Sequence, residues 1–225
     1  VTPEADDLLT QNAYLHLGLA YLQTEDKNKA RMAFEQASAM NHDVAIKEQA
    51  AYNHALCIHE TSYSAFGESV LVFERCLNEF TSSAYVDKIS NYLVEVYLNT
   101  RSYDAALQSI DRITHPTRTV LEAKQKILFQ LGTQQFTNAL FEQAASYFNQ
   151  CLALGETHHP TLTEANYWMG ETQYRMGQYD TAQSYFLRYL ALEQSTANET
   201  YALANYNLGY LAFHRKAYTE AINRF

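Results

Sequence analysis

Apolar residues recur along this chain at the spacing of one helix face, in stretches that come in pairs. Near the start, Tyr14, Leu17 and Tyr21 lie three and four positions apart, and Ala30 and Phe34 follow after a polar segment. Such intervals mark the buried face of an amphipathic helix, and the polar segment marks a turn between two helices. The pattern therefore predicts an all-α chain made of helical hairpins.

One triplet of residues sets the length of the repeating unit. Gly170 is followed twelve residues later by Ala182 and sixteen residues later by Phe186. The same triplet recurs three more times, as Gly18, Ala30 and Phe34, as Gly132, Ala144 and Phe148, and as Gly209, Ala221 and Phe225. Gly18 and Gly132 are 114 residues apart, three times the 38 between Gly132 and Gly170, so two less regular copies are expected between them.

The two less regular copies carry other residues in the glycine position. Ala55 is followed by Phe73 after eighteen residues, so two extra residues lie in the turn around 61–64. Val94 is followed by Ile110 after sixteen residues, and its larger side chain predicts a slightly splayed hairpin. The whole chain therefore predicts about six hairpins, over residues 8–40, 44–80, 84–113, 117–154, 162–192 and 199–225.

The glycines have a physical reason. Inside a helix, glycine costs about 1 kcal/mol relative to alanine, so its return to one position in four hairpins indicates a packing requirement. Helices approach most closely where the side chains at the crossing are small. We therefore expect these glycines at helix crossings, with the alanines of the triplets opposite them.

The pattern Tyr14, Leu17-Gly18, Tyr21, Ala30 and Phe34 resembles the tetratricopeptide repeat (TPR), although the family's usual period is about 34 residues. The resemblance implies a right-handed α-α superhelix, a TPR solenoid, whose concave wall holds a segment of a partner protein. Units of 37 to 39 residues are similar to those of bacterial cell-envelope coordinator and outer-membrane assembly proteins. This narrower similarity favours the bacterial periplasm or cell envelope over the cytoplasm.

Aromatic residues give the implied concave wall its character. The chain has 18 tyrosines, and large aromatic side chains are favoured in protein interfaces. Lys88, Lys126 and Arg175 lie beside the same helix face and would orient a carboxylate of the partner. The alternative is that the rings pack between hairpins. The candidate partner-binding residues are Tyr52, Tyr92, Lys126, Phe129, Tyr167, Trp168, Tyr174, Arg175, Tyr206 and Phe213.

Other kinds of site are less well supported by the sequence. Some TPR domains clamp a C-terminal carboxylate with lysines, but the matching helix faces here carry aromatic residues and Asn91. His59-Glu60 lacks the second histidine of a zinc-protease motif, because position 63 is a tyrosine. His158-His159 lacks a third metal ligand. No catalytic, cofactor-binding or metal-binding residues are predicted.

Composition narrows the class of partner. The net charge of −9 argues against a nucleic-acid partner. The sequence has no run of eighteen apolar residues, so a membrane-inserted helix is not predicted. Cys57, Cys76 and Cys151 are odd in number and lack metal-like spacing, so buried, unpaired thiols are expected. The chain begins without methionine and stops inside a predicted helix, so a piece of a longer protein is expected.

These observations favour a non-catalytic scaffold that binds a protein or peptide segment. Two alternatives stay open. In the first, the array acts as an architectural spacer or associates with itself through its ends. In the second, it regulates a catalytic or signalling domain that lies beyond residue 225.

Overall fold

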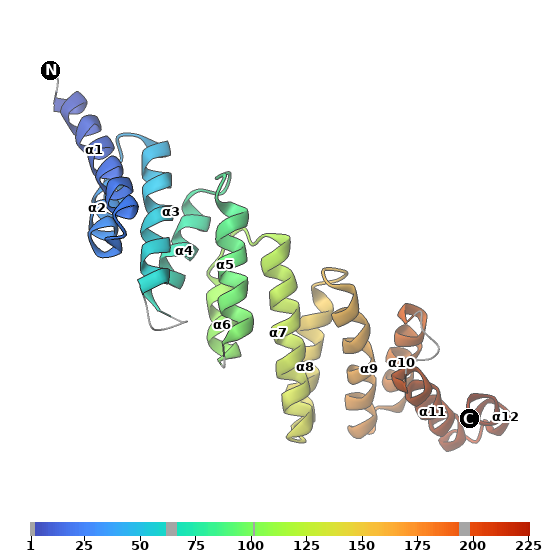
Figure 1. Ribbon diagram of the computed structural model, residues 1–225. Coiled ribbons are helices and arrows are strands. Elements are labelled where there is room, and N and C mark those ends of the chain that lie inside the picture. Colours follow the sequence, from blue (N-terminus) through green and yellow to red (C-terminus); the bar gives the residue numbers. More distant parts are fainter. Residues whose placement is uncertain (1–2, 62–66, 101, 194–198) are drawn as a thin grey trace. The chain divides into compact units, whose positions relative to one another are not determined.

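The computed structural model consists of antiparallel helix pairs (Figure 1) and describes residues 3–61, 67–100, 102–193 and 199–225. Twelve α-helices and no strands occur in these residues, so the predicted all-α class of six hairpins is confirmed. The first helices of the pairs are α1 (Pro3–Gln23), α3 (Val44–Thr61), α5 (Val86–Asn99), α7 (Arg118–Thr137), α9 (His159–Arg175) and α11 (Glu199–His214). The second helices are α2 (Lys27–Ala39), α4 (Glu68–Glu79), α6 (Tyr103–Asp111), α8 (Phe141–Ala153), α10 (Tyr179–Leu192) and α12 (Tyr218–Arg224).

The helices form two compact units, residues 1–120 and 121–225. Helix α1 begins at Pro3, earlier than the predicted position 8, because proline is well suited to the first turn of a helix, where no N–H is needed. Asp43 caps α3 by accepting the N–H of Ile46 at 3.0 Å. The extra residues predicted in the turn around 61–64 lie outside the described residues, apart from Thr61.

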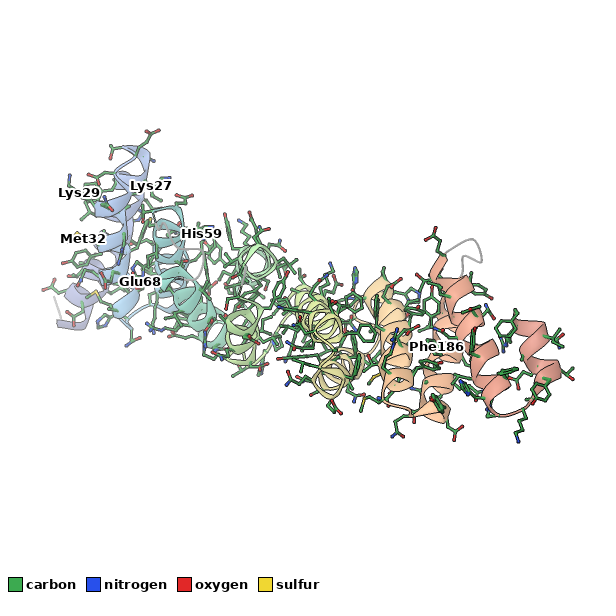
Figure 2. All side chains as sticks on the ribbon, turned by 90° about the horizontal axis from the view of Figure 1, so that it is seen from below. Lys27, Lys29, Met32, His59, Glu68 and Phe186 are labelled. Carbon is green, nitrogen blue, oxygen red and sulfur yellow. The ribbon has the colours of Figure 1, made fainter. Side chains whose placement is uncertain are left out.

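Each repeated glycine packs against the phenylalanine that follows sixteen residues later. A Cβ atom added to Gly170 would lie 2.8 Å from the ring of Phe186, and one added to Gly18 would lie 2.5 Å from the ring of Phe34. Real Cβ atoms essentially never approach so closely. The close packing predicted for these positions is therefore confirmed, but the side chain nearest to each glycine is the phenylalanine of the triplet and not the alanine that was expected there. Phe186 lies inside its hairpin (Figure 2).

Four hairpin turns place one residue in the left-handed conformation, always seven residues after the glycine. These residues are Glu25, Ala139, Gly177 and Lys216, with φ of 59°, 59°, 75° and 64°. In the turn that contains Gly177, the N–H of Gln178 donates to the carbonyl of Gln173 at 2.8 Å, which ends α9 in a Schellman motif. Three of these four residues carry side chains in a conformation that favours glycine.

Two buried glutamines close the ends of hairpins. Nε2 of Gln11 donates to the carbonyls of Met40 (3.0 Å) and Asp43 (3.2 Å), while its Oε1 accepts the N–H of Asp43 at 2.8 Å. Gln125 accepts the N–H of His158 at 2.7 Å in the same way, and each glutamine lies seven residues before a repeated glycine. These bonds satisfy backbone groups that a helix end leaves without partners.

A buried polar network joins α4 to α6 in the first unit, where the repeated glycine is missing. The carboxylate of Glu74 is almost fully buried and accepts bonds from the guanidinium of Arg112 at 2.7 and 2.8 Å and from the hydroxyl of Ser109. The hydroxyls of Tyr97 and Ser109 lie 2.7 Å apart. Hydrogen bonds between α4 and the end of α6 thus link the second hairpin to the third. The splay expected at Val94 stays a prediction.

The three cysteines are buried and unpaired, as predicted. Burial raises the pKa of Cys57 to about 11 and those of Cys76 and Cys151 to about 12, so all three are neutral thiols near pH 7. Among the helices described, none combines the length and apolar character needed to cross a bilayer.

Candidate functional site

An open cavity in the first unit brings two of the predicted residues together. It has a volume of about 420 Å³ and lies where α3 meets α5, lined by Tyr52, Lys88, Asn91, Tyr92 and Glu95. We call it the α3/α5 pocket. Tyr92 is half-buried, while Tyr52 is only 8% exposed, so its ring forms the floor. Most of the Tyr52 side chain is therefore covered, and only a small part of it is open to the pocket.

Aromatic stacking holds the floor of the α3/α5 pocket in place. The ring of Tyr52 stacks on Tyr85, with centroids 4.2 Å apart and an interplanar angle of 15°. The ring of Tyr92 stacks on Phe73 at 5.7 Å and meets the edge of His59 at 5.4 Å. Rings packed on several sides lose little further freedom on binding. Sequence reasoning missed Tyr85 because it precedes α5 and belongs to no helix face.

The rim of the α3/α5 pocket is polar and lies along one face of α5. Lys88, Asn91 and Glu95 are exposed and follow one another at intervals of three and four residues. The pocket thus presents a cation, an amide and an anion in a row above aromatic rings. Burial raises the pKa of Tyr52, so its hydroxyl is neutral at pH 7.

A smaller cavity in the second unit has a related layout. It measures about 190 Å³ and is lined by Lys126, Phe129, Gln130, Pro160, Thr161 and Glu164, from α7 and the start of α9. Lys126 lies 38 residues after Lys88, at the equivalent repeat position. The pKa of Glu164 is raised by burial and by the neighbouring charge of Glu193. A lysine, an aromatic ring and a carboxylate therefore recur together here.

Three of the predicted residues belong to the core of the second unit. Tyr167 is 7% exposed, with its ring 5.8 Å from Phe186 and 5.5 Å from Tyr189, and its hydroxyl donates to Glu171 at 3.1 Å. For Tyr167 the structure follows the alternative that the rings pack between hairpins, because α11 packs over this ring in the same hydrophobic cluster. Trp168 and Tyr174 are half-buried against that cluster.

The remaining predicted residues are exposed. Arg175 is the last residue of α9, and Tyr206 and Phe213 lie on α11. The ring of Tyr206 contacts Tyr210 at 4.9 Å, and that of Phe213 contacts Tyr218 at 5.7 Å. Their exposure makes them accessible, and their contact with a partner stays a prediction.

The histidines considered for metal binding have separate surroundings. His158 caps α9 by accepting the N–H of Thr161, whereas His159 lies 3.4 Å from Glu156. Burial lowers the pKa of His54, and its Nε2 has no hydrogen-bond partner among the described residues. No cluster of three metal-ligating side chains occurs within the described part of the chain.

Stacked helical hairpins of this kind define the class of helical-repeat proteins. Models of the tetratricopeptide repeat match residues 11–43 and 167–225. These two segments therefore match the tetratricopeptide repeat, and each lies on helices of the hairpins described above. No curated protein matches the chain in sequence.

Several solved structures are similar to this chain. Pseudomonas aeruginosa pilF is 17% identical, with 97% of this chain and 90% of that chain covered and a TM-score of 0.41. MamA is 16% identical, with 83% and 92% covered and a TM-score of 0.41. The TPR-like repeats of a putative kinesin light chain from Podosopora anserina are 13% identical, with 95% and 90% covered and a TM-score of 0.38.

Proposed function

We propose that this chain is a non-catalytic scaffold that binds an extended segment of a partner protein, with the α3/α5 pocket as a principal contact. The main observation in support of this proposal is a cavity of about 420 Å³ that combines a packed aromatic floor with an exposed lysine, asparagine and glutamate. The presence of tetratricopeptide repeats supports a role in protein–protein interaction.

The three rim residues define the chemistry of the partner segment. An asparagine amide both donates and accepts, so Asn91 can bond the N–H and the carbonyl of a partner's main chain. Lys88 and Glu95 are seven residues apart on α5, which is about 10 Å along a helix. An extended peptide covers that distance in about three residues. The preferred segment therefore has an acidic residue and a basic residue about three positions apart, with an apolar side chain between them.

The test starts with capture of partners by the intact chain from bacterial envelope and cytoplasmic fractions. The affinity of the captured segment is then compared for the wild type and Asn91→Ala. Because Asn91 is exposed, the fold should persist while binding weakens by about 1–3 kcal/mol, the range of interface hot spots. The matched control is Gln108→Ala, which removes an exposed amide from α6. Equal affinities for wild type and Asn91→Ala would contradict the proposal.

The charges at the rim allow a stronger test. Lys88→Glu should abolish the preference for an acidic residue at the matching partner position, and a charge-reversed peptide should restore binding to this variant. Restoration would tie the α3/α5 pocket to the partner directly, because a general loss of folding cannot be repaired by changing the peptide. A location in the bacterial envelope stays a prediction, as do the roles of spacer or attached regulatory domain.

A further inference from the structure

One position of the first helices carries a histidine in a single hairpin and an apolar residue in the others. This position lies one residue before the repeated small residue, and in α3 it is His54. His54 is only 9% exposed, and its Nε2 has no hydrogen-bond partner among the described residues. The equivalent residues of the other five first helices are Leu17, Leu93, Leu131, Met169 and Leu208. A histidine at this position needs a physical reason, because burying a polar nitrogen without a hydrogen bond costs free energy.

A cavity opens beside this histidine in the first unit, and we call it the His54 cavity. It has a volume of about 350 Å³ and lies among α2, α3 and α4 (Figure 1). Its inner lining includes Ala39 of α2, Ala51 and His54 of α3, and Cys76 of α4. The His54 cavity therefore lies between the first and second hairpins and not at either end of the array.

The next interface along the chain, among α4, α5 and α6, is filled at the equivalent positions. The residues that correspond to Ser38, Ala39, His54 and Cys76 are Leu77, Asn78, Leu93 and Ile113. Leu77, Leu93 and Ile113 are buried there. The first interface thus carries smaller or more polar residues at these positions, and the His54 cavity occupies the space that apolar side chains fill one hairpin later.

The charged residues of the two interfaces also correspond. In the later interface the guanidinium of Arg112 donates to the buried carboxylate of Glu74. The residues at the same repeat positions in the first interface are Glu35 and Arg75, and both line the His54 cavity. Within the described part of the chain, neither the Glu35 carboxylate nor the Arg75 guanidinium takes part in an ion pair or a hydrogen bond.

These charges define the chemistry of a ligand. The other two charged residues of the lining, Lys47 and Glu79, pair with each other. A ligand with only an anionic group would face the free carboxylate of Glu35, and one with only a cationic group would face the free guanidinium of Arg75. A zwitterion complements both, and its carboxylate can bind the guanidinium through two parallel hydrogen bonds.

We propose that the His54 cavity binds a small zwitterion with a carboxylate and an ammonium group, such as a free amino acid or a dipeptide. The carboxylate binds Arg75, the ammonium group binds Glu35, and a polar group of the ligand bonds the imidazole of His54. The volume of about 350 Å³ is in the range of small-molecule sites. The site goes beyond the proposed binding of a partner segment and shares no lining residue with the α3/α5 pocket.

Nuclear magnetic resonance of the intact chain tests the proposal through the ring signals of His54, which His54→Leu identifies by their loss. The natural L-amino acids and glycine-containing dipeptides are added one at a time, up to about 10 mM. At least one compound should shift the ring signals saturably, and the two sets show whether an amino acid or a dipeptide is preferred. Arg75→Gln and Glu35→Gln should each weaken that binding at least about tenfold. Both positions are exposed, so the fold should persist.

The matched control is Arg188→Gln, which removes an exposed arginine at the same repeat position of α10 and should leave the affinity unchanged. Acetate and methylammonium each carry one of the two charges and should bind more weakly than the zwitterion. Equal binding of either ion would overturn the proposal, as would an unchanged affinity in Arg75→Gln or Glu35→Gln. No response of His54 to any compound would exclude the site and indicate that Glu35 and Arg75 pair with each other, as their counterparts in the next interface do.

Discussion

The hairpins α9/α10 and α11/α12 carry the same residue types at equivalent positions and bury them very differently. Tyr167 is 7% exposed and Tyr206 is 49% exposed, while Phe186 is fully buried and Phe225 is 62% exposed. In a solenoid, each repeat contacts only its neighbours. The comparison teaches that the neighbouring hairpin, and not the residue type, decides whether an aromatic ring belongs to the core or to a surface.

Packing inside the two hairpins is nevertheless the same. A Cβ atom added to Gly170 would lie 2.8 Å from its phenylalanine ring, and one added to Gly209 would lie 2.7 Å from its own. The difference comes from contacts between hairpins, because Leu208 and Leu211 of α11 join Tyr167 and Phe186 in one hydrophobic cluster. Each hairpin therefore forms through short-range contacts and gains its core from the next.

The largest expected difference concerns the paired phenylalanines. Phe186→Ala should lower the free energy of unfolding by about 3–5 kcal/mol, because it empties a packed site in the core. Phe225→Ala should cost about 0.5 kcal/mol, as at an exposed position. Urea unfolding followed by circular dichroism measures both. Equal losses would mean that the two hairpins are equally covered in solution.

The paired glycines should show a smaller difference. In Gly170→Ala the new methyl group meets a ring that is locked in the core, so a net loss of about 1–3 kcal/mol is expected. In Gly209→Ala the exposed ring of Phe225 can turn away, and the higher helix propensity of alanine, about 1 kcal/mol, offsets the cost. Melting temperatures of the two variants make the comparison. A neutral Gly170→Ala would show that the close contact is not required.

The loss of stability at alkaline pH should depend more on Tyr167 than on Tyr206. Burial raises the pKa of Tyr167 well above its ordinary value, so the fold favours the neutral phenol. Stability from this group is fully present below about pH 10 and falls above it, by at most about 1.4 kcal/mol per pH unit, because the unfolded chain releases its proton first. Tyr167→Phe should flatten the fall in unfolding free energy measured above pH 10. Tyr206→Phe, at an exposed ring, should change that slope less.

The smallest expected effect lies in the two turns. Gly177 and Lys216 occupy equivalent left-handed positions, with φ of 75° and 64°. Gly177→Ala should destabilise the chain by about 1 kcal/mol, and Lys216→Gly should stabilise its hairpin by up to about 1 kcal/mol. Hydrogen exchange of the amides in α11 and α12 detects the second change even if that hairpin opens on its own. Faster exchange in Lys216→Gly would contradict the turn argument.

The sequence predicted only part of the candidate site. Tyr52 and Tyr92 were predicted together and share the α3/α5 pocket, and Lys126 and Phe129 share the smaller cavity. Tyr167 was a candidate partner-binding residue, and it lies in the core. Helix periodicity gives the face on which a side chain lies but not how far the next hairpin covers that face.

The sequence by itself determined the hairpins, their period and the glycine crossings. These features depend on helical periodicity and on contacts over short separations, such as the sixteen residues between Gly170 and Phe186. Only the tertiary structure decided the closure by Gln11, the network around Glu74 and the stacking of Tyr85 in the α3/α5 pocket. Those contacts join residues about thirty or more positions apart, across hairpins, where no local spacing rule records which side chains meet.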